Sequence, residues 1–413
     1  MNRLIVPTLL LFLLASPGWA KETVYGMSKK TYDAINKIQI MIEEERFDEA
    51  LAEVELVKER KLNGYERAHV LNMQGFLAFQ LEDSDGALNA YREALEQEGL
   101  PDSQVRALLN SVAQVSLAVE RYADAELYAR KLIATETEAP QPLSQVILAQ
   151  ALVGQEKWEE SIDPLKTAIE MQRAMGAKPR ENWMAMLSSI YYTLERYEDM
   201  RDVLYEIIEL YPAERYILNL AALHGQLEEP GKQLALVESL RDDERIDRGF
   251  HLLMLANLFI SQGTPLKAAE LLDKEIASGR IEASRQNLEL NSQAWYMAGD
   301  EARAIPPLEA AAAKEDDGKL YLRIARLHMD LYQWKPAEVA ARKALDRGGL
   351  KEPGDAWLLV GMALARGDKL DAARIAFVEA AKHDSSEKWA RQWLRFVEVE
   401  QERTAALTRA PGS

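Results

Sequence analysis

Cysteine is absent from the 413-residue chain. Its absence excludes disulfides, thiol nucleophiles, thiolate metal sites and iron–sulfur clusters. Glycine and proline are scarce, at 21 and 15 residues spread along the chain. An all-β protein would need more of them for the frequent turns between its strands. Basic residues are outnumbered, since 50 Lys and Arg stand against 67 Asp and Glu for a formal net charge of −17. This acidic balance disfavours a nucleic-acid partner.

Catalytic motifs are missing as well. The five histidines are scattered along the chain and form no His-x-x-x-His pair, so no metal site is expected. The sequence contains no glycine-rich loop for binding phosphate and no Gly-x-Ser-x-Gly elbow for a nucleophilic serine. We therefore predict no metal, no cofactor and no enzymatic activity. An enzyme such as a glycan-binding hydrolase is the alternative, and it would need an inward-facing pair of acids.

Residues 1–20 have the features of a secretory signal peptide. Arg3 is followed by an apolar stretch from Leu4 to Ala15, and small residues precede a predicted cleavage after Ala20. The stretch is shorter than the roughly 20 apolar residues of a membrane span, although retention as an anchor stays an alternative. We expect secretion to the periplasm of a Gram-negative bacterium, no membrane span after cleavage, and a flexible lead-in over 21–30.

A repeated pattern governs the rest of the chain. An apolar-periodic helix, a short polar turn and a second helix with a small residue near its start recur about every 36 residues. The small-residue slot is occupied in turn by Ala50, Ala87, Ala125, Ser161, Met200, Gln233, Ala268, Ala304, Ala337 and Ala373. The spacing predicts about ten helix-turn-helix units.

This pattern resembles the tetratricopeptide repeat (TPR) family. In the last unit Trp357 and Gly361 match the first-helix signature, and Ala373, Phe377 and Ala380 match the second. The resemblance covers residues 31–385 and implies an all-α, right-handed superhelix. Small residues such as Gly361 let the two helices of a unit approach closely.

Two units and two proline sites depart from the pattern. Met200 and Gln233 are large for their slot, which predicts wider helix spacing or a shifted register there. Pro164 and the pair Pro306 and Pro307 fall near the start of second helices, where only the first turn tolerates a missing N–H. We therefore expect those helices to begin late.

The last repeat is followed by a predicted capping helix over 386–407. Trp389, Trp393, Phe396 and Val397 form one apolar stripe at i, i+4, i+7 and i+8. Core packing against the last repeat is the main interpretation. A partner-docking face is the alternative, and 408–413 are expected to form a disordered tail.

Several side chains with chemical potential are interpreted as packed. His224 and His328 occupy a slot where the TPR family usually has an inward aromatic residue, so a packed, hydrogen-bonded ring is expected for each. Tyr191, Tyr192 and Tyr197 are compatible with a sugar platform, but their helical spacing favours the core.

The family resemblance also implies a partner-binding groove lined by the first helices. Carried onto this sequence, the groove holds Tyr32, Gln39, Asn72, Phe76, Asn110, Gln114, Gln150, Asn182, Tyr192, Asn257, Gln293 and Arg326. Asn and Gln offer both a donor and an acceptor, which suits the backbone of an extended peptide. An ordinary hydrophilic surface is the alternative. The carboxylate clamp of chaperone-binding TPR domains is not supported, because Ile35, Asn72 and Asn110 replace its basic residues.

Charge is unevenly distributed along the chain. Residues 21–300 contain 49 acids and 30 bases, whereas residues 301–400 contain 17 of each. Such a field favours a basic partner and should weaken with salt. Simple solubility is the alternative explanation.

The signal segment, the lack of cysteine and the degenerate repeats resemble periplasmic TPR proteins associated with TonB systems of gamma-proteobacteria. The resemblance implies an accessory scaffold of an energy-transducing uptake system that binds a basic periplasmic segment of the transducer. An adaptor or regulator of envelope biogenesis, acting on a cell-wall synthase or a secretion channel, is the alternative.

Overall fold

The computed structural model describes residues 26–136 and 141–409, with side chains described up to residue 404. The predicted signal peptide and residues 21–25 of the predicted lead-in lie outside the described residues, as do residues 410–413 of the predicted tail. Helix α1 begins at Lys29, so Lys29 and Lys30 are helical rather than part of the lead-in.

The described residues form 21 helices and no strand. The helices pair into ten hairpins followed by one long helix, which confirms the prediction of an all-α fold with about ten units. The chain divides into two compact units, residues 1–203 and 204–413, here called the N-terminal and C-terminal units. The division falls within α10.

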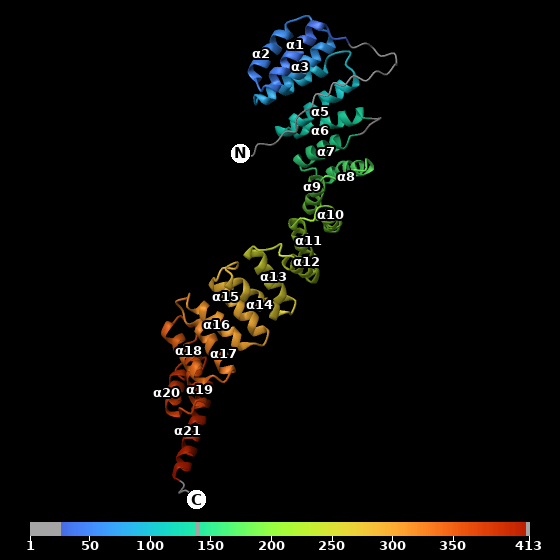
Figure 1. The fold of residues 1–413 in the computed structure, drawn as a ribbon. Coiled ribbons are helices and arrows are strands. Elements are labelled where there is room, and N and C mark those ends of the chain that lie inside the picture. Colours follow the sequence, from blue (N-terminus) through green and yellow to red (C-terminus); the bar gives the residue numbers. More distant parts are fainter. Residues whose placement is uncertain (1–25, 137–140, 410–413) are drawn as a thin grey trace. The chain divides into compact units, whose positions relative to one another are not determined.

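In the N-terminal unit, consecutive helices stack side by side as antiparallel pairs (Figure 1). Its hairpins are α1 (Lys29–Glu43) with α2 (Phe47–Lys58), α3 (Gly64–Gln80) with α4 (Ser84–Leu95), α5 (Asp102–Ala118) with α6 (Tyr122–Thr135), α7 (Pro142–Gly154) with α8 (Trp158–Ala174), and α9 (Glu181–Thr193) with α10 (Tyr197–Leu210).

The C-terminal unit repeats this arrangement and ends in the capping helix. Its hairpins are α11 (Glu214–Gln226) with α12 (Pro230–Asp242), α13 (Gly249–Ser261) with α14 (Pro265–Ala277), α15 (Arg285–Met297) with α16 (Glu301–Ala312), α17 (Lys319–Asp330) with α18 (Trp334–Arg347), and α19 (Pro353–Arg366) with α20 (Leu370–Ala380), followed by α21 (Glu387–Arg409).

All ten hairpins use the same three-residue turn. The middle residue has a left-handed backbone, and it is Glu45, Glu82, Glu120, Glu156, Glu195, Glu228, Gly263, Gly299, Tyr332 or Asp368. The N–H of the next residue donates to the carbonyl five residues earlier, as from Arg121 to Ser116 at 2.8 Å. This is a Schellman motif, which satisfies carbonyls at the end of the first helix. The turn therefore fixes how each hairpin folds back.

Small residues let the two helices of a hairpin touch. The predicted slots Ala87, Ala125, Ala268 and Ala373 are fully buried. A Cβ at Gly361 would lie only 2.5 Å from Cε1 of Phe377, which is well inside van der Waals contact. The expected close approach of the helices is confirmed.

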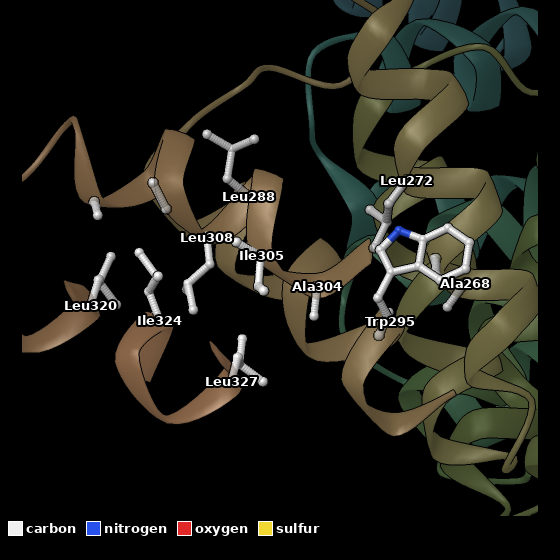
Figure 2. Close-up of a cluster of buried hydrophobic side chains, with 14 of the residues drawn as sticks. Ala268, Leu272, Leu288, Trp295, Ala304, Ile305, Leu308, Leu320, Ile324 and Leu327 are labelled. Atoms are coloured by element: carbon white, nitrogen blue, oxygen red, sulfur yellow. The ribbon is translucent and has the colours of Figure 1, made fainter. Parts of the chain in front are cut away.

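A continuous apolar core runs through the C-terminal unit. Figure 2 shows part of it, where Trp295 of α15 lies beside Leu272 of α14 and Leu308 of α16 lies near Ile324 of α17. The indole N–H of Trp295 donates to Oδ2 of Asp273 at 3.1 Å. Each helix thus buries apolar side chains against the helix before it and the helix after it, and the core grows hairpin by hairpin.

The prediction that the proline-containing second helices begin late was wrong. Helix α8 begins at Trp158 and α16 at Glu301, so Pro164, Pro306 and Pro307 lie inside their helices. Proline at these positions leaves the carbonyl four residues earlier without a donor. Those carbonyls belong to residues 160, 302 and 303, all exposed, so water can replace the lost bonds while the buried faces hold the helices together.

The large residue in the sixth hairpin is accommodated by a change in its neighbour. A Cβ at Gly225 of α11 would lie 2.9 Å from the amide oxygen and nitrogen of Gln233 on α12. The missing side chain at Gly225 therefore provides the volume that Gln233 occupies. The sequence predicted wider helix spacing or a shifted register to make space for Gln233. In the structure Gly225, one turn after Ala221, provides that space.

The capping helix uses only part of its predicted stripe for packing. Val397 is fully buried, and Trp393 stacks on Phe377 with ring centroids 5.6 Å apart. Trp389 and Phe396 are exposed, so the prediction of a single packed stripe was wrong for these two. The helix is wound at 3.6 residues per turn, and the residues that face α19 and α20 lie on a narrower arc than the whole stripe.

Candidate partner-binding surface

Six of the predicted groove residues share one register position, directly after the small residue of the first helix. We call them the first-helix row. They are Phe76 on α3, Gln114 on α5, Gln150 on α7, Asn257 on α13, Gln293 on α15 and Arg326 on α17. The residues before them, such as Ala113, Ala149 and Ala256, are fully buried, whereas the row itself is half-buried or exposed. The repeat therefore presents one side chain per hairpin at the surface at this position.

In the N-terminal unit, two amides of the predicted set are joined. Nε2 of Gln114 donates to Oδ1 of Asn110 at 2.9 Å, one turn earlier on α5. Helix α5 packs against α7, which carries the exposed Gln150. Asn72 and Phe76 lie on α3, where Phe76 is half-buried against the core of the first hairpin. The amides are thus at the surface, and Phe76 also contributes to packing.

Helix α9 contributes one exposed aromatic ring and one exposed amide. Asn182 is exposed, and the Tyr192 side chain is 61% exposed. Tyr191 is buried, with the Arg196 guanidinium 5.0 Å from its ring centroid. Burial raises the pKa of Tyr191. The interpretation as a core residue is confirmed for Tyr191 and wrong for Tyr192, because adjacent residues on a helix point about 100° apart.

The C-terminal unit adds exposed apolar residues that were not predicted. Phe250 is 74% exposed on α13, and Tyr296 and Met297 are exposed on α15. Phe250 has the register of Asn182, six residues before the buried small residue, and Tyr296 has the register of Tyr192. Extending the predicted register to every hairpin would have found both.

Polar groups of this unit are partly engaged with neighbours. Asn257 donates from Nδ2 to the carbonyl of Leu253 at 2.8 Å. Arg326 lies 3.5 Å from Oδ2 of Asp355 on α19. These two contacts are exposed, so a partner can replace either of them at a small cost in free energy.

The two histidines singled out in the sequence are packed or hydrogen-bonded. His224 is fully buried, with Nδ1 2.6 Å from Oε2 of Glu229 and Nε2 3.3 Å from the Tyr205 hydroxyl. His328 is half-buried, and its Nδ1 lies 2.7 Å from Oε1 of Gln333. The expectation of packed, hydrogen-bonded rings is confirmed for both positions.

Within residues 26–136 and 141–409, no group of three or more His, Asp or Glu side chains is arranged to hold a metal ion. None of the helices described there is both long enough and apolar enough to cross a bilayer.

Comparison with known proteins identifies the repeat. The tetratricopeptide repeat profile matches residues 322–388, from α17 to the start of α21. No curated protein matches the chain. The match lies within the C-terminal unit and covers only a small part of the chain.

Solved structures of several repeat proteins are similar in fold. MamA from Desulfovibrio magneticus RS-1 is 16% identical, with a TM-score of 0.39, over 45% of this chain and 97% of that chain. The TPR2AB domain of yeast Sti1, solved in complex with pHSP90, is 13% identical, with a TM-score of 0.34, over 72% and 99%. YrrB, described as a TPR protein with an unusual peptide-binding site, is 15% identical, with a TM-score of 0.35, over 46% and 96%.

Proposed function

We propose that this chain is a protein-binding scaffold that holds an extended, basic segment of a partner protein against the first helices of its hairpins. The observation that carries the proposal is the first-helix row, which within each unit places a surface side chain at one register position in three consecutive hairpins, on α3, α5 and α7 and on α13, α15 and α17. A regular row of this kind suits a ligand that is itself regular, and an extended peptide backbone has that property.

The chemistry of the row favours backbone recognition. Gln114, Gln150, Asn257 and Gln293 each carry an amide group that is both donor and acceptor. Peptide N–H and C=O groups need both. Exposed rings nearby, such as Tyr192 and Tyr296, add apolar surface for side chains of the bound segment.

The charge of the chain favours a basic segment. Residues 21–300, which include the amides on α3, α5 and α7, contain 49 acids and 30 bases. An acidic field of this size speeds the encounter with a cationic partner, and salt screens it. We propose that the partner is a Lys-rich periplasmic segment of a TonB-type transducer, and that the chain acts in the periplasm. The predicted signal segment and the acidic charge support this assignment.

Binding of a fluorescent Lys-rich peptide tests the recognition step. We expect Gln150→Ala, in the first-helix row, to weaken binding several-fold, because the change removes about 0.5–1.5 kcal/mol of hydrogen bonding. Asn89→Ala is the matched control, since Asn89 is also exposed but lies on the second helix α4. Equal affinities for the two variants would show that the first-helix row is not the binding surface.

Crosslinking in cells tests the pathway. The tagged protein should capture transducer and motor components, and less of them when the crosslinker is added at a higher salt concentration. Capture of cell-wall synthases or secretion components would instead assign the chain to envelope biogenesis and leave the peptide-binding result intact.

A further inference from the structure

Helix α21 carries a second apolar face that packs against nothing in the part of the chain that the structure describes. Trp389, Phe396 and Val399 are 55%, 43% and 61% exposed. Together with the exposed Gln392 they lie at i, i+3, i+7 and i+10, which is one stripe of a helix. Exposed rings and a valine in a single line form a patch, whereas isolated exposed apolar residues need no explanation.

The stripe is separate from the face that caps the repeats. Ala390 and Val397 are fully buried, and Trp393 stacks on Phe377 of α20. Every earlier first helix turns back after 12 to 17 residues and receives a second helix, but α21 continues for 23 residues.

A charged stripe runs beside the apolar one. Lys388, Arg391 and Arg395 precede Glu398 and Glu402 at i, i+3, i+7, i+10 and i+14. The first half of this stripe is thus basic and the second half acidic. A two-fold axis perpendicular to the middle of the helix would place the basic half of one copy opposite the acidic half of a second copy.

We infer that α21 pairs with α21 of a second copy of this chain in antiparallel orientation. Lys388 then lies at the level of Glu402 of the second copy, and Arg391 at the level of Glu398 of the second copy. Arg395 lies at the two-fold axis, at the level of Arg395 of the second copy and about one turn from Glu398 of the second copy. The apolar stripes meet along the same axis and bury Trp389, Phe396 and Val399.

Sedimentation velocity of the purified chain over a wide concentration range tests the pairing. We expect a monomer–dimer equilibrium whose dissociation constant rises more than about tenfold in Phe396→Glu, because an aromatic anchor at the centre of the interface is replaced by a charge. Val339→Glu is the matched control, since Val339 is 42% exposed on α18 and should leave dimerisation unchanged.

A charge exchange tests the orientation. Lys388→Glu with Arg391→Glu should weaken the dimer, and adding Glu398→Lys with Glu402→Lys should restore it. Circular dichroism establishes that each variant keeps its helix content. A chain that stays monomeric at every concentration would overturn the proposal, as would equal effects of Phe396→Glu and Val339→Glu. A dimer unaffected by the first charge change would overturn the antiparallel geometry.

Discussion

Replacing Gly361 by alanine sets two opposing effects against each other. Gly361 lies inside α19, where alanine favours the helix by about 1 kcal/mol over glycine. The added Cβ would lie 2.5 Å from Cε1 and 2.6 Å from Cδ1 of Phe377. Normal carbon contacts are about 3.5–4.0 Å, so the ring must move by about 1 Å.

The ring has little room to move. Phe377 is fully buried, and Trp393 stacks on it at an interplanar angle of 14°. Overpacking of this kind costs about 1–3 kcal/mol, more than the gain in helix propensity. We expect a net loss of up to about 2 kcal/mol in the stability of the last hairpin, which is a factor of up to roughly 30 in its opening equilibrium.

Amide hydrogen exchange of the α19 and α20 peptides measures this opening directly. Gly231→Ala is the control, because a Cβ at Gly231 meets nothing within 4 Å, and it should slow exchange in α12. Gly361→Ala combined with Phe377→Leu should recover part of the loss, which gives a coupling energy. If Gly361→Ala slowed exchange as Gly231→Ala does, the close approach of the two helices would not be the constraint at this position.

Three further outcomes follow from the structure. Gly263 has φ of +73° in its turn, so Gly263→Ala should lower the free energy of unfolding by about 1–2 kcal/mol, measured by urea denaturation. Burial tends to raise the pKa of Glu126, but hydrogen bonds led by Lys157 lower it to about 2. Ionised Glu126 therefore contributes to the free energy of unfolding at pH values above its ordinary pKa near 4.5, and this contribution is lost as the pH falls toward 2. Glu126→Gln should make the free energy of unfolding fall less between pH 4.5 and pH 2. A free energy of unfolding that depends on pH as in the wild type would contradict the role of Glu126. Asp273→Ala leaves the buried indole N–H of Trp295 without its acceptor and should cost about 1–3 kcal/mol in thermal or urea unfolding.

Much of the fold could be predicted because it is local and repeated. The small-residue slots gave the number of hairpins, and their burial at Ala87 or Ala268 follows from helix packing alone. The turns were predictable in position but not in conformation. A glutamate such as Glu120 with a left-handed backbone is not favoured by its own preference, and the Schellman hydrogen bonds of the hairpin select it.

What escaped prediction depends on contacts between neighbours. Pro164 was judged by the cost of a lost hydrogen bond, although the exposed carbonyl it leaves can be hydrated. Gln233 was judged alone, although Gly225 makes room for it. For the candidate surface, the register predicted exposed amides such as Gln150 and Asn257 correctly as surface residues. The exposed Phe250 was not predicted, although it has the same register position as Asn182.

The shared three-residue turn bears on how the chain would respond to mechanical load. Each hairpin is closed by its own Schellman bonds, and helices pack mainly on their neighbours in sequence. Tension between the ends of a unit would therefore have no long-range strand pairing to break. We expect extension to proceed by detaching one hairpin at a time from the end of the stack, each release exposing the next apolar face. The hairpins would therefore detach one after another under tension, and the chain would lengthen in steps as each one is released.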